Sequence, residues 1–106
     1  MQNQPTELTV KIIANDSGTP AGKLADAEFH FSSGPLAGLK LIGFAVWERR
    51  SGGSRNVTFP ARLYTVNGER RSFALLRSLT DASAQERIRD LILGAYESAV
   101  AEGGGS

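Results

Sequence analysis

Two stretches in the first third of the chain alternate between apolar and polar side chains. Residues 8–12 and 25–32 each place every second side chain on an apolar face. The apolar positions are Leu8, Val10, Ile12, Ala25, Ala27, Phe29 and Phe31. A period of two predicts two strands that bury one face and expose the other.

Residues 39–47 carry apolar side chains on both faces of a predicted third strand. Unbroken alternation places Leu39, Leu41, Ala45 and Trp47 on one face, and Ile42, Phe44 and Val46 on the other. Such a strand is covered on both sides or paired with another subunit. Trp47 is then either a core residue, which its apolar neighbours favour, or an exposed ring that stacks on a ligand.

Residues 59–73 read as two strands around a tight turn. Asn67-Gly68 is a strong hairpin signal, because the turn that joins two strands most tightly needs a positive φ at both of its central residues. With that turn, Tyr64 lies opposite Arg71 and Arg62 lies opposite Phe73, so one face of the hairpin interleaves arginines with aromatic rings. Pro60 cannot donate to a strand ladder and marks an edge, a bulge or a strand break.

The last third of the chain has helical periodicity. Ser83 and Glu86 have the spacing of a capping box, in which each side chain binds the other residue's backbone N–H. An apolar stripe follows at Ile88, Leu91, Ile92, Ala95 and Ala99. We therefore predict an α+β fold, an antiparallel meander of about five strands with a C-terminal helix packed on it. One domain spans residues 7–101, and residues 1–6 and 102–106 are expected to be flexible termini.

Charge is segregated along the 106 residues, although the net charge is only +1. Residues 40–77 have a net charge of +6, whereas the segments before and after carry −2 and −3. Seven of the eight basic residues in the central segment are arginines, which suit planar, bidentate recognition of anions. This segregation is compatible with a polyanionic partner.

Several classes of protein do not fit the composition. The chain has no cysteine, so we expect neither disulfides nor thiolate chemistry, and a reducing cytoplasm is the simplest location. No apolar run reaches the ~20 residues of a spanning helix, and residues 1–5 lack the features of a secretory signal. We expect no membrane association, no cofactor and no metal, since one histidine without cysteine makes a poor metal site.

Catalysis also has little support in the sequence. Glu28, His30 and Ser32 share one strand face, which superficially supplies an acid, a base and a nucleophile. Neighbours on one face are about 6–7 Å apart at Cα, too far for an ordered triad. We expect a solvated polar face there, no enzymatic activity and no small-molecule substrate.

The hairpin and its neighbouring loop are the candidate functional region. Arginine stems can simply pack over aromatic rings on a solvated sheet. Alternatively, the same face is a platform for nucleic acid, on which arginines neutralise phosphates and rings stack on bases. The candidate nucleic-acid-binding residues are Arg49, Arg50, Arg55, Arg62, Tyr64, Arg70 and Arg71.

Three segments resemble the stage V sporulation protein G (SpoVG) family of bacterial nucleic-acid-binding regulators. Residues 88–96 (IRDLILGAY) are similar to that family's helix pattern, residues 57–62 (VTFPAR) to its apolar–Pro–small–basic stretch, and residues 68–73 (GERRSF) to its Gly-Glu-Phe turn region. The family's His-Pro after the hairpin is replaced here by Ala-Leu-Leu at 74–76, and its basic tail is missing. The resemblance implies a homodimer whose basic residues after the proline bind DNA or RNA, and among these only Arg62 matches by position.

Together these observations predict a cytoplasmic, homodimeric bacterial regulator that binds DNA or RNA without catalysis. The alternative is a protein-interaction module or accessory subunit, with the arginine face docked on an acidic protein partner.

Overall fold

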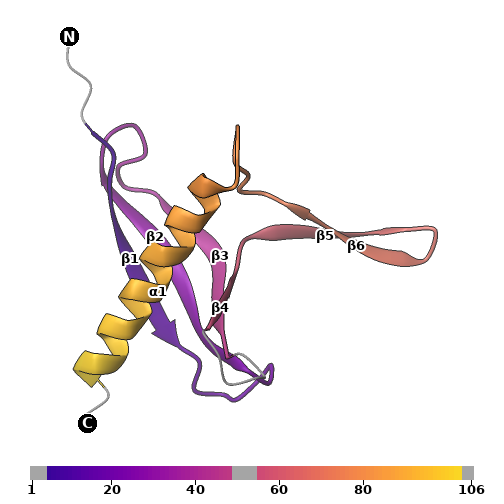
Figure 1. Cartoon of the computed structure of the whole chain (residues 1–106), viewed down its shortest axis with the longest axis horizontal. Coiled ribbons are helices and arrows are strands. Elements are labelled where there is room, and N and C mark those ends of the chain that lie inside the picture. The colour runs from indigo at the N-terminus through magenta and orange to yellow at the C-terminus, as the bar shows by residue number, and fades with distance from the viewer. Residues whose placement is uncertain (1–4, 49–54, 104–106) are drawn as a thin grey trace.

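The computed structural model describes residues 5–48 and 55–103. These residues form six strands and one helix: β1 (Glu7–Ala14), β2 (Lys23–Ser33), β3 (Lys40–Trp47), β4 (Asn56–Thr58), β5 (Ala61–Val66), β6 (Glu69–Ala74) and α1 (Ser83–Gly103). β1 to β4 make one antiparallel sheet in chain order, and α1 lies across one of its faces (Figure 1). The predicted α+β class and the helix packed on a meander are confirmed.

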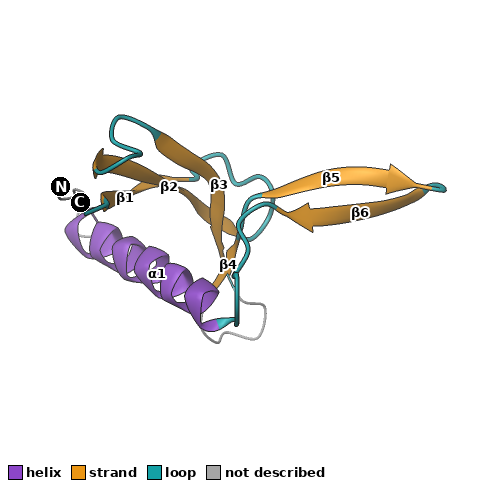
Figure 2. Cartoon of the chain, turned by 90° about the horizontal axis from the view of Figure 1, so that it is seen from above, coloured by secondary structure: helices purple, strands orange, loops and turns teal. Residues whose placement is uncertain are grey.

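The hairpin β5–β6 does not continue this sheet but forms a separate two-stranded one. It projects away from the sheet and the helix, as both views show (Figures 1 and 2). Every residue of β5 and β6 is exposed. The structure therefore consists of two parts. The first, which we call the body, is formed by β1 to β4 and α1, and the second is the projecting hairpin β5–β6.

The core of the body lies between the sheet and the helix. Its buried members are Ala25, Ala27, Phe29, Phe44, Val46, Val57 and Ile92. The rings of Phe29 and Phe44 are 4.8 Å apart between centroids, and Phe59 meets Phe44 edge-on at 5.5 Å. These tilted and edge contacts are the arrangements that aromatic quadrupoles favour.

A bulge in β3 changes the faces that strict alternation predicted. Phe29 pairs with Leu41, and Ala27 pairs with Phe44. Between these two pairs β3 contains one residue more than β2, which is a β-bulge. Gly43 lies within the bulge at φ 110°, a conformation that side chains disfavour. Leu41 and Phe44 consequently share the core face, and Ile42 is 56% exposed. The predicted grouping of residues 39–47 is therefore wrong, because the extra residue inverts the faces beyond it.

Pro60 lies between β4 and β5 and is buried. A Cβ added to Gly43 would lie 2.8 Å from the Cβ of Pro60, so the Pro60 side chain packs closely against the Gly43 backbone at the root of the hairpin. The Pro60 carbonyl accepts a hydrogen bond from the Leu75 N–H at 3.0 Å. Pro60 is thus a strand break, as predicted, and it fastens both ends of the hairpin to the body.

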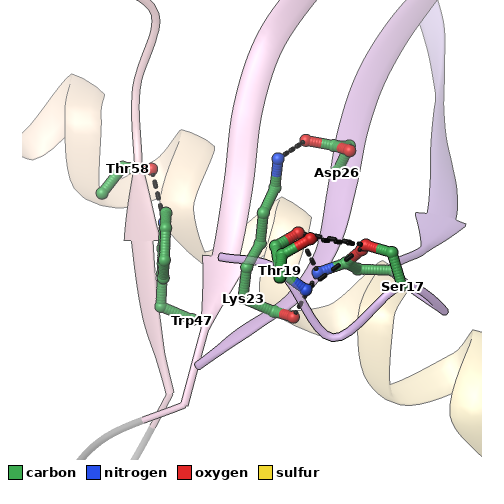
Figure 3. A network of polar contacts seen from close by, with 7 residues as sticks. Ser17, Thr19, Lys23, Asp26, Trp47 and Thr58 are labelled. Carbon is green, nitrogen blue, oxygen red and sulfur yellow. Dashed lines mark hydrogen bonds and ion pairs between the residues drawn. The ribbon is translucent and has the colours of Figure 1, made fainter. Parts of the chain in front are cut away.

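Trp47 lies near the end of β3 and is half-buried. Its indole N–H donates to Thr58 Oγ1 at 2.8 Å (Figure 3). Nearby, Lys23 pairs with Asp26 at 2.6 Å, and Asn15 binds the Lys23 carbonyl at 2.9 Å. Trp47 is not part of the core cluster, so the favoured prediction of a core residue is wrong; it lies at the end of β3, with its indole N–H bound to β4.

The helix begins with a different cap from the one predicted. Asp81 accepts hydrogen bonds from both the backbone N–H and the hydroxyl of Ser83. The Ser83 N–H is therefore already bound and is not available to Glu86. The capping-box prediction is wrong because the carboxylate two residues earlier competes successfully for the same donor.

The helix stripe is also shifted from the predicted one. Ile88, Ile92 and Tyr96 pack on the core at a spacing of four residues, together with Leu93. Leu91 is 48% exposed and Ala99 is also exposed. The predicted stripe was therefore correct at Ile88 and Ile92 and wrong at Leu91 and Ala99.

Candidate nucleic-acid interface

The hairpin has the register that the Asn-Gly turn predicts. Arg62 pairs with Phe73, Tyr64 with Arg71, and Val66 with Glu69. Asn67 and Gly68 have φ values of 52° and 80°, which are the positive angles that this turn requires. The predicted pairing of arginines with aromatic residues across the two strands is confirmed.

One face of the hairpin therefore gathers two arginines and two rings. We call Arg62, Tyr64, Arg71 and Phe73 the arginine–aromatic face. Tyr64 is 41% exposed and Phe73 is 50% exposed, so both rings present surface to a ligand. Arg62, Tyr64 and Phe73 line a common shallow hollow. Cross-strand and diagonal neighbours are close enough for a single ligand to touch all four side chains.

Charges on this face are only partly compensated. Arg71 Nη2 donates to Glu69 Oε1 at 2.8 Å, and both side chains are more than half exposed. An exposed pair of this kind contributes little, about 0–1 kcal/mol, so a phosphate can compete for Arg71. Arg62 forms no ion pair with any residue in the described ranges.

Arg77 joins the arginine–aromatic face from outside the hairpin strands. Its guanidinium carbon lies 4.7 Å from the centroid of the Phe73 ring, a cation–π contact. Sequence reasoning did not select this residue. The strand alternation does not predict this contact, because β6 ends at Ala74 and Arg77 lies beyond it.

The other candidate residues lie elsewhere. Arg70 pairs with Thr65 on the opposite face of the hairpin, the face that also carries Leu63. Arg55 precedes β4 and lies over the ring of Tyr96 on the helix, 5.1 Å from its centroid. Arg49 and Arg50 fall outside the described residues. The structure thus brings together Arg62, Tyr64 and Arg71 and separates Arg55 and Arg70 from them.

A second polar cluster lies on β2 and β3. His30 Nε2 and Glu28 Oε1 are 2.9 Å apart, and Lys40 Nζ lies 3.5 Å from the same oxygen. The hydrogen bond with His30, assisted by Lys40, lowers the pKa of Glu28 below its ordinary value. The Ser32 hydroxyl instead donates to the Glu7 carbonyl.

Glu28 and His30 are hydrogen-bonded to each other, but the three residues do not form an ordered triad, as expected from the sequence. The Glu28 and His30 side chains are hydrogen-bonded along β2, whereas the Ser32 hydroxyl is bonded to β1. In the part of the chain that the structure describes, Glu28 contacts His30 and Lys40, and the Ser32 hydroxyl is not bonded to this pair.

Within residues 5–48 and 55–103, no three His, Asp or Glu side chains are grouped as metal ligands. The helix in the described part of the chain is not long and apolar enough to cross a membrane. Comparison with protein-family models, curated proteins and solved structures found no match for this chain.

Proposed function

We propose that this protein binds DNA or RNA through the arginine–aromatic face of its hairpin and acts as a non-catalytic regulator. The observation that carries this proposal is the register of β5 and β6, which alternates cations and exposed rings on one free face. Arginines on such a face neutralise phosphates, and aromatic rings stack on bases in single strands. The resemblance of residues 57–62 and 68–73 to the SpoVG family supports the same class.

We further propose that the protein is a homodimer. A two-stranded hairpin is at best marginally stable by itself, and this one has exposed apolar side chains on both strands. They are Leu63, Val66 and Phe73, with exposed fractions of 66%, 40% and 50%. Val66 and Phe73 lie on the arginine–aromatic face, whereas the opposite face carries Leu63 among small residues, namely Ala61, Ser72 and Ala74, with Thr65 and Arg70 next to the turn. A second copy that covers this face would support the hairpin and leave the arginine–aromatic face free.

The alternative, a module that docks an acidic protein, has one specific observation in its favour. Leu75 and Leu79, which follow the hairpin, are 60% and 100% exposed. Large exposed apolar side chains next to a basic face are typical of protein interfaces. Such a partner would contact both the arginines and these leucines, whereas a nucleic acid would leave the leucines uncovered.

The salt dependence of binding to DNA and RNA oligomers of random sequence tests the proposal. Affinity should fall by about 0.9 log units per log unit of salt for each duplex phosphate that is neutralised, and by about 0.7 for single strands. The absence of binding at low salt would reject the nucleic-acid function and favour the protein-docking alternative.

A further inference from the structure

Two successive cross-strand pairs on the arginine–aromatic face each hold one ring and one cation. In the first pair Tyr64 lies opposite Arg71, and in the second Phe73 lies opposite Arg62. The ring is on β5 in one pair and on β6 in the other, so Tyr64 and Phe73 are diagonal neighbours. A nucleotide has one base, which can stack on a ring, and one phosphate, which can bind a cation. Each cross-strand pair therefore offers contacts for the two parts of one nucleotide.

The spacing of the two rings fits a strand whose bases are not stacked on each other. Diagonal neighbours in an antiparallel pair are about 7–8 Å apart. Neighbouring nucleotides in one strand of a B-DNA duplex are only about 3.4 Å apart along the helix axis. Two successive bases can therefore reach both rings only if they separate from each other, which a single strand allows and a duplex resists.

Both rings also have surface on which a base can lie. Tyr64 is 41% exposed and Phe73 is 50% exposed, and the hairpin projects away from the body (Figures 1 and 2). The Arg77 guanidinium contacts Phe73, and a guanidinium plane is itself a surface on which bases stack. In the part of the chain that the structure describes, no cation lies over the Tyr64 ring. Tyr64 is therefore the more accessible of the two rings.

Duplex DNA accounts for only half of this face. A two-stranded ribbon can enter the major groove, where Arg62 and Arg71 could contact phosphates or the edges of guanines. The groove presents only base edges, however, so Tyr64 and Phe73 would have no base to stack on. A duplex ligand thus explains the arginines and leaves the exposed rings without a role.

We infer that the hairpin selects single-stranded over duplex nucleic acid. Two successive bases stack on Tyr64 and Phe73, and their phosphates bind Arg71 and Arg62. This inference rests on the proposed nucleic-acid function and names the class of its ligand. Every base has a face that can stack, so the site should accept single strands of DNA or RNA with little preference for sequence.

The affinity of the full chain for three end-labelled ligands of about twelve nucleotides, measured by fluorescence anisotropy at one low salt concentration, tests this selectivity. The ligands are oligothymidylate, an abasic strand with the same phosphates, and the duplex of oligothymidylate with oligoadenylate. We expect oligothymidylate to bind at least tenfold more tightly than the other two, because only its bases are free to stack on the rings. Oligouridylate should exceed the abasic strand by a similar factor, and its affinity relative to oligothymidylate shows whether RNA or DNA is preferred.

Substitution of Tyr64 separates stacking from charge. Tyr64→Ala should weaken the binding of oligothymidylate about tenfold, as expected for the loss of one stacked base, and should change the binding of the abasic strand and the duplex less than twofold. Tyr64→Phe keeps a ring and should bind like the wild type. Leu39→Ala is the control, at an exposed side chain between β2 and β3, and should change none of these affinities. Circular dichroism establishes that each variant is folded, and the comparison of ligands on the wild type carries the test if Tyr64→Ala is not.

The possible failures can be told apart. A duplex or an abasic strand that binds as tightly as oligothymidylate would overturn the preference for single strands. If Arg62→Glu with Arg71→Glu abolished that binding, the nucleic-acid function would stand and the hairpin would be assigned to phosphates or to a duplex groove. The absence of binding to every ligand at low salt would instead reject the proposed function, and the preference for single strands with it.

Discussion

Gly43 allows the body and the hairpin to meet closely. It combines a φ of 110° with a position against Pro60, where a methyl group would approach the proline Cβ to 2.8 Å. Both features exclude a side chain, one through the backbone angle and the other through space. Gly94, in the helix, has neither restriction, since nothing lies within 4 Å of its added Cβ.

Gly43→Ala should therefore destabilise the protein by about 1–3 kcal/mol, because the backbone must leave its angle or move Pro60. Gly94→Ala is the matched control and should stabilise by about 0.5–1 kcal/mol, as expected when alanine replaces glycine in a helix. Urea unfolding of both variants measures the difference. Equal stability of the two variants would show that the contact with Pro60 is not tight.

Glu28 is the residue that should make the body sensitive to acid. Its pKa is lowered in the fold by His30 first and by Lys40, so its contribution to stability is present above its ordinary value of 4.5. That contribution is lost as the pH falls through the lowered pKa. Asp81, whose pKa is lowered by its hydrogen bonds to Ser83, adds a loss of the same sign.

Glu28→Gln should consequently reduce the loss of stability between pH 7 and pH 3, as measured by unfolding midpoints. Glu97→Gln, an exposed position on the helix, is the control and should unfold with the acid sensitivity of the wild type. An unchanged pH profile for Glu28→Gln would mean that this ion pair does not contribute to stability in solution.

At the scale of secondary-structure elements, α1 covers the apolar face of the sheet β1–β4 and completes the core. Ile92 is fully buried, whereas the neighbouring Leu91 is 48% exposed. The two side chains have the same number of carbons, so they separate the effect of burial from that of chemistry.

Ile92→Ala should cost ~2–5 kcal/mol of unfolding free energy, the range for a large apolar side chain removed from a core. Leu91→Ala should cost less than about 1 kcal/mol, since much of its surface already faces water. Chemical denaturation checks both values. A larger loss at Leu91 than at Ile92 would place the helix in a different rotation on the sheet.

The hairpin was the element that could be predicted best from the sequence. Asn67-Gly68 fixes both the turn and the register, so the pairs of Arg62 with Phe73 and Tyr64 with Arg71 follow from local chemistry. The faces of β3 could not be predicted in the same way. A single bulged residue inverts the alternation, and Gly43 alone does not reveal whether a bulge is present.

The part of the candidate site that lies on the hairpin was predictable from the sequence, and the rest was not. Tyr64 and the two arginines on its face follow from strand register, but the position of Arg55 beside Tyr96 depends on how the helix packs. Arg77 contacts Phe73 from the irregular segment after β6, to which no strand or helix period applies. The capping of α1 by Asp81 was missed because two acceptors compete for one N–H, and spacing does not rank them.

At the scale of the whole molecule, we propose that a second copy of the chain covers the face of the hairpin that carries Leu63. Leu63→Glu places a charge on the face that we assign to a second copy. It should shift light-scattering mass from dimer to monomer, since burial of an unpaired carboxylate is costly. Leu36→Glu is the control, at an exposed leucine between β2 and β3. A wild-type protein that is monomeric at tens of micromolar would contradict the dimer.

Charge reversal on the arginine–aromatic face tests the proposed function most directly. Arg62→Glu with Arg71→Glu should abolish oligonucleotide binding at moderate salt and leave the melting temperature close to that of the wild type, because both side chains are exposed. Arg87→Glu with Arg89→Glu makes the same change of charge on the exposed surface of α1 and should reduce binding much less. Binding of the first double variant at wild-type strength would contradict a nucleic-acid interface on this hairpin.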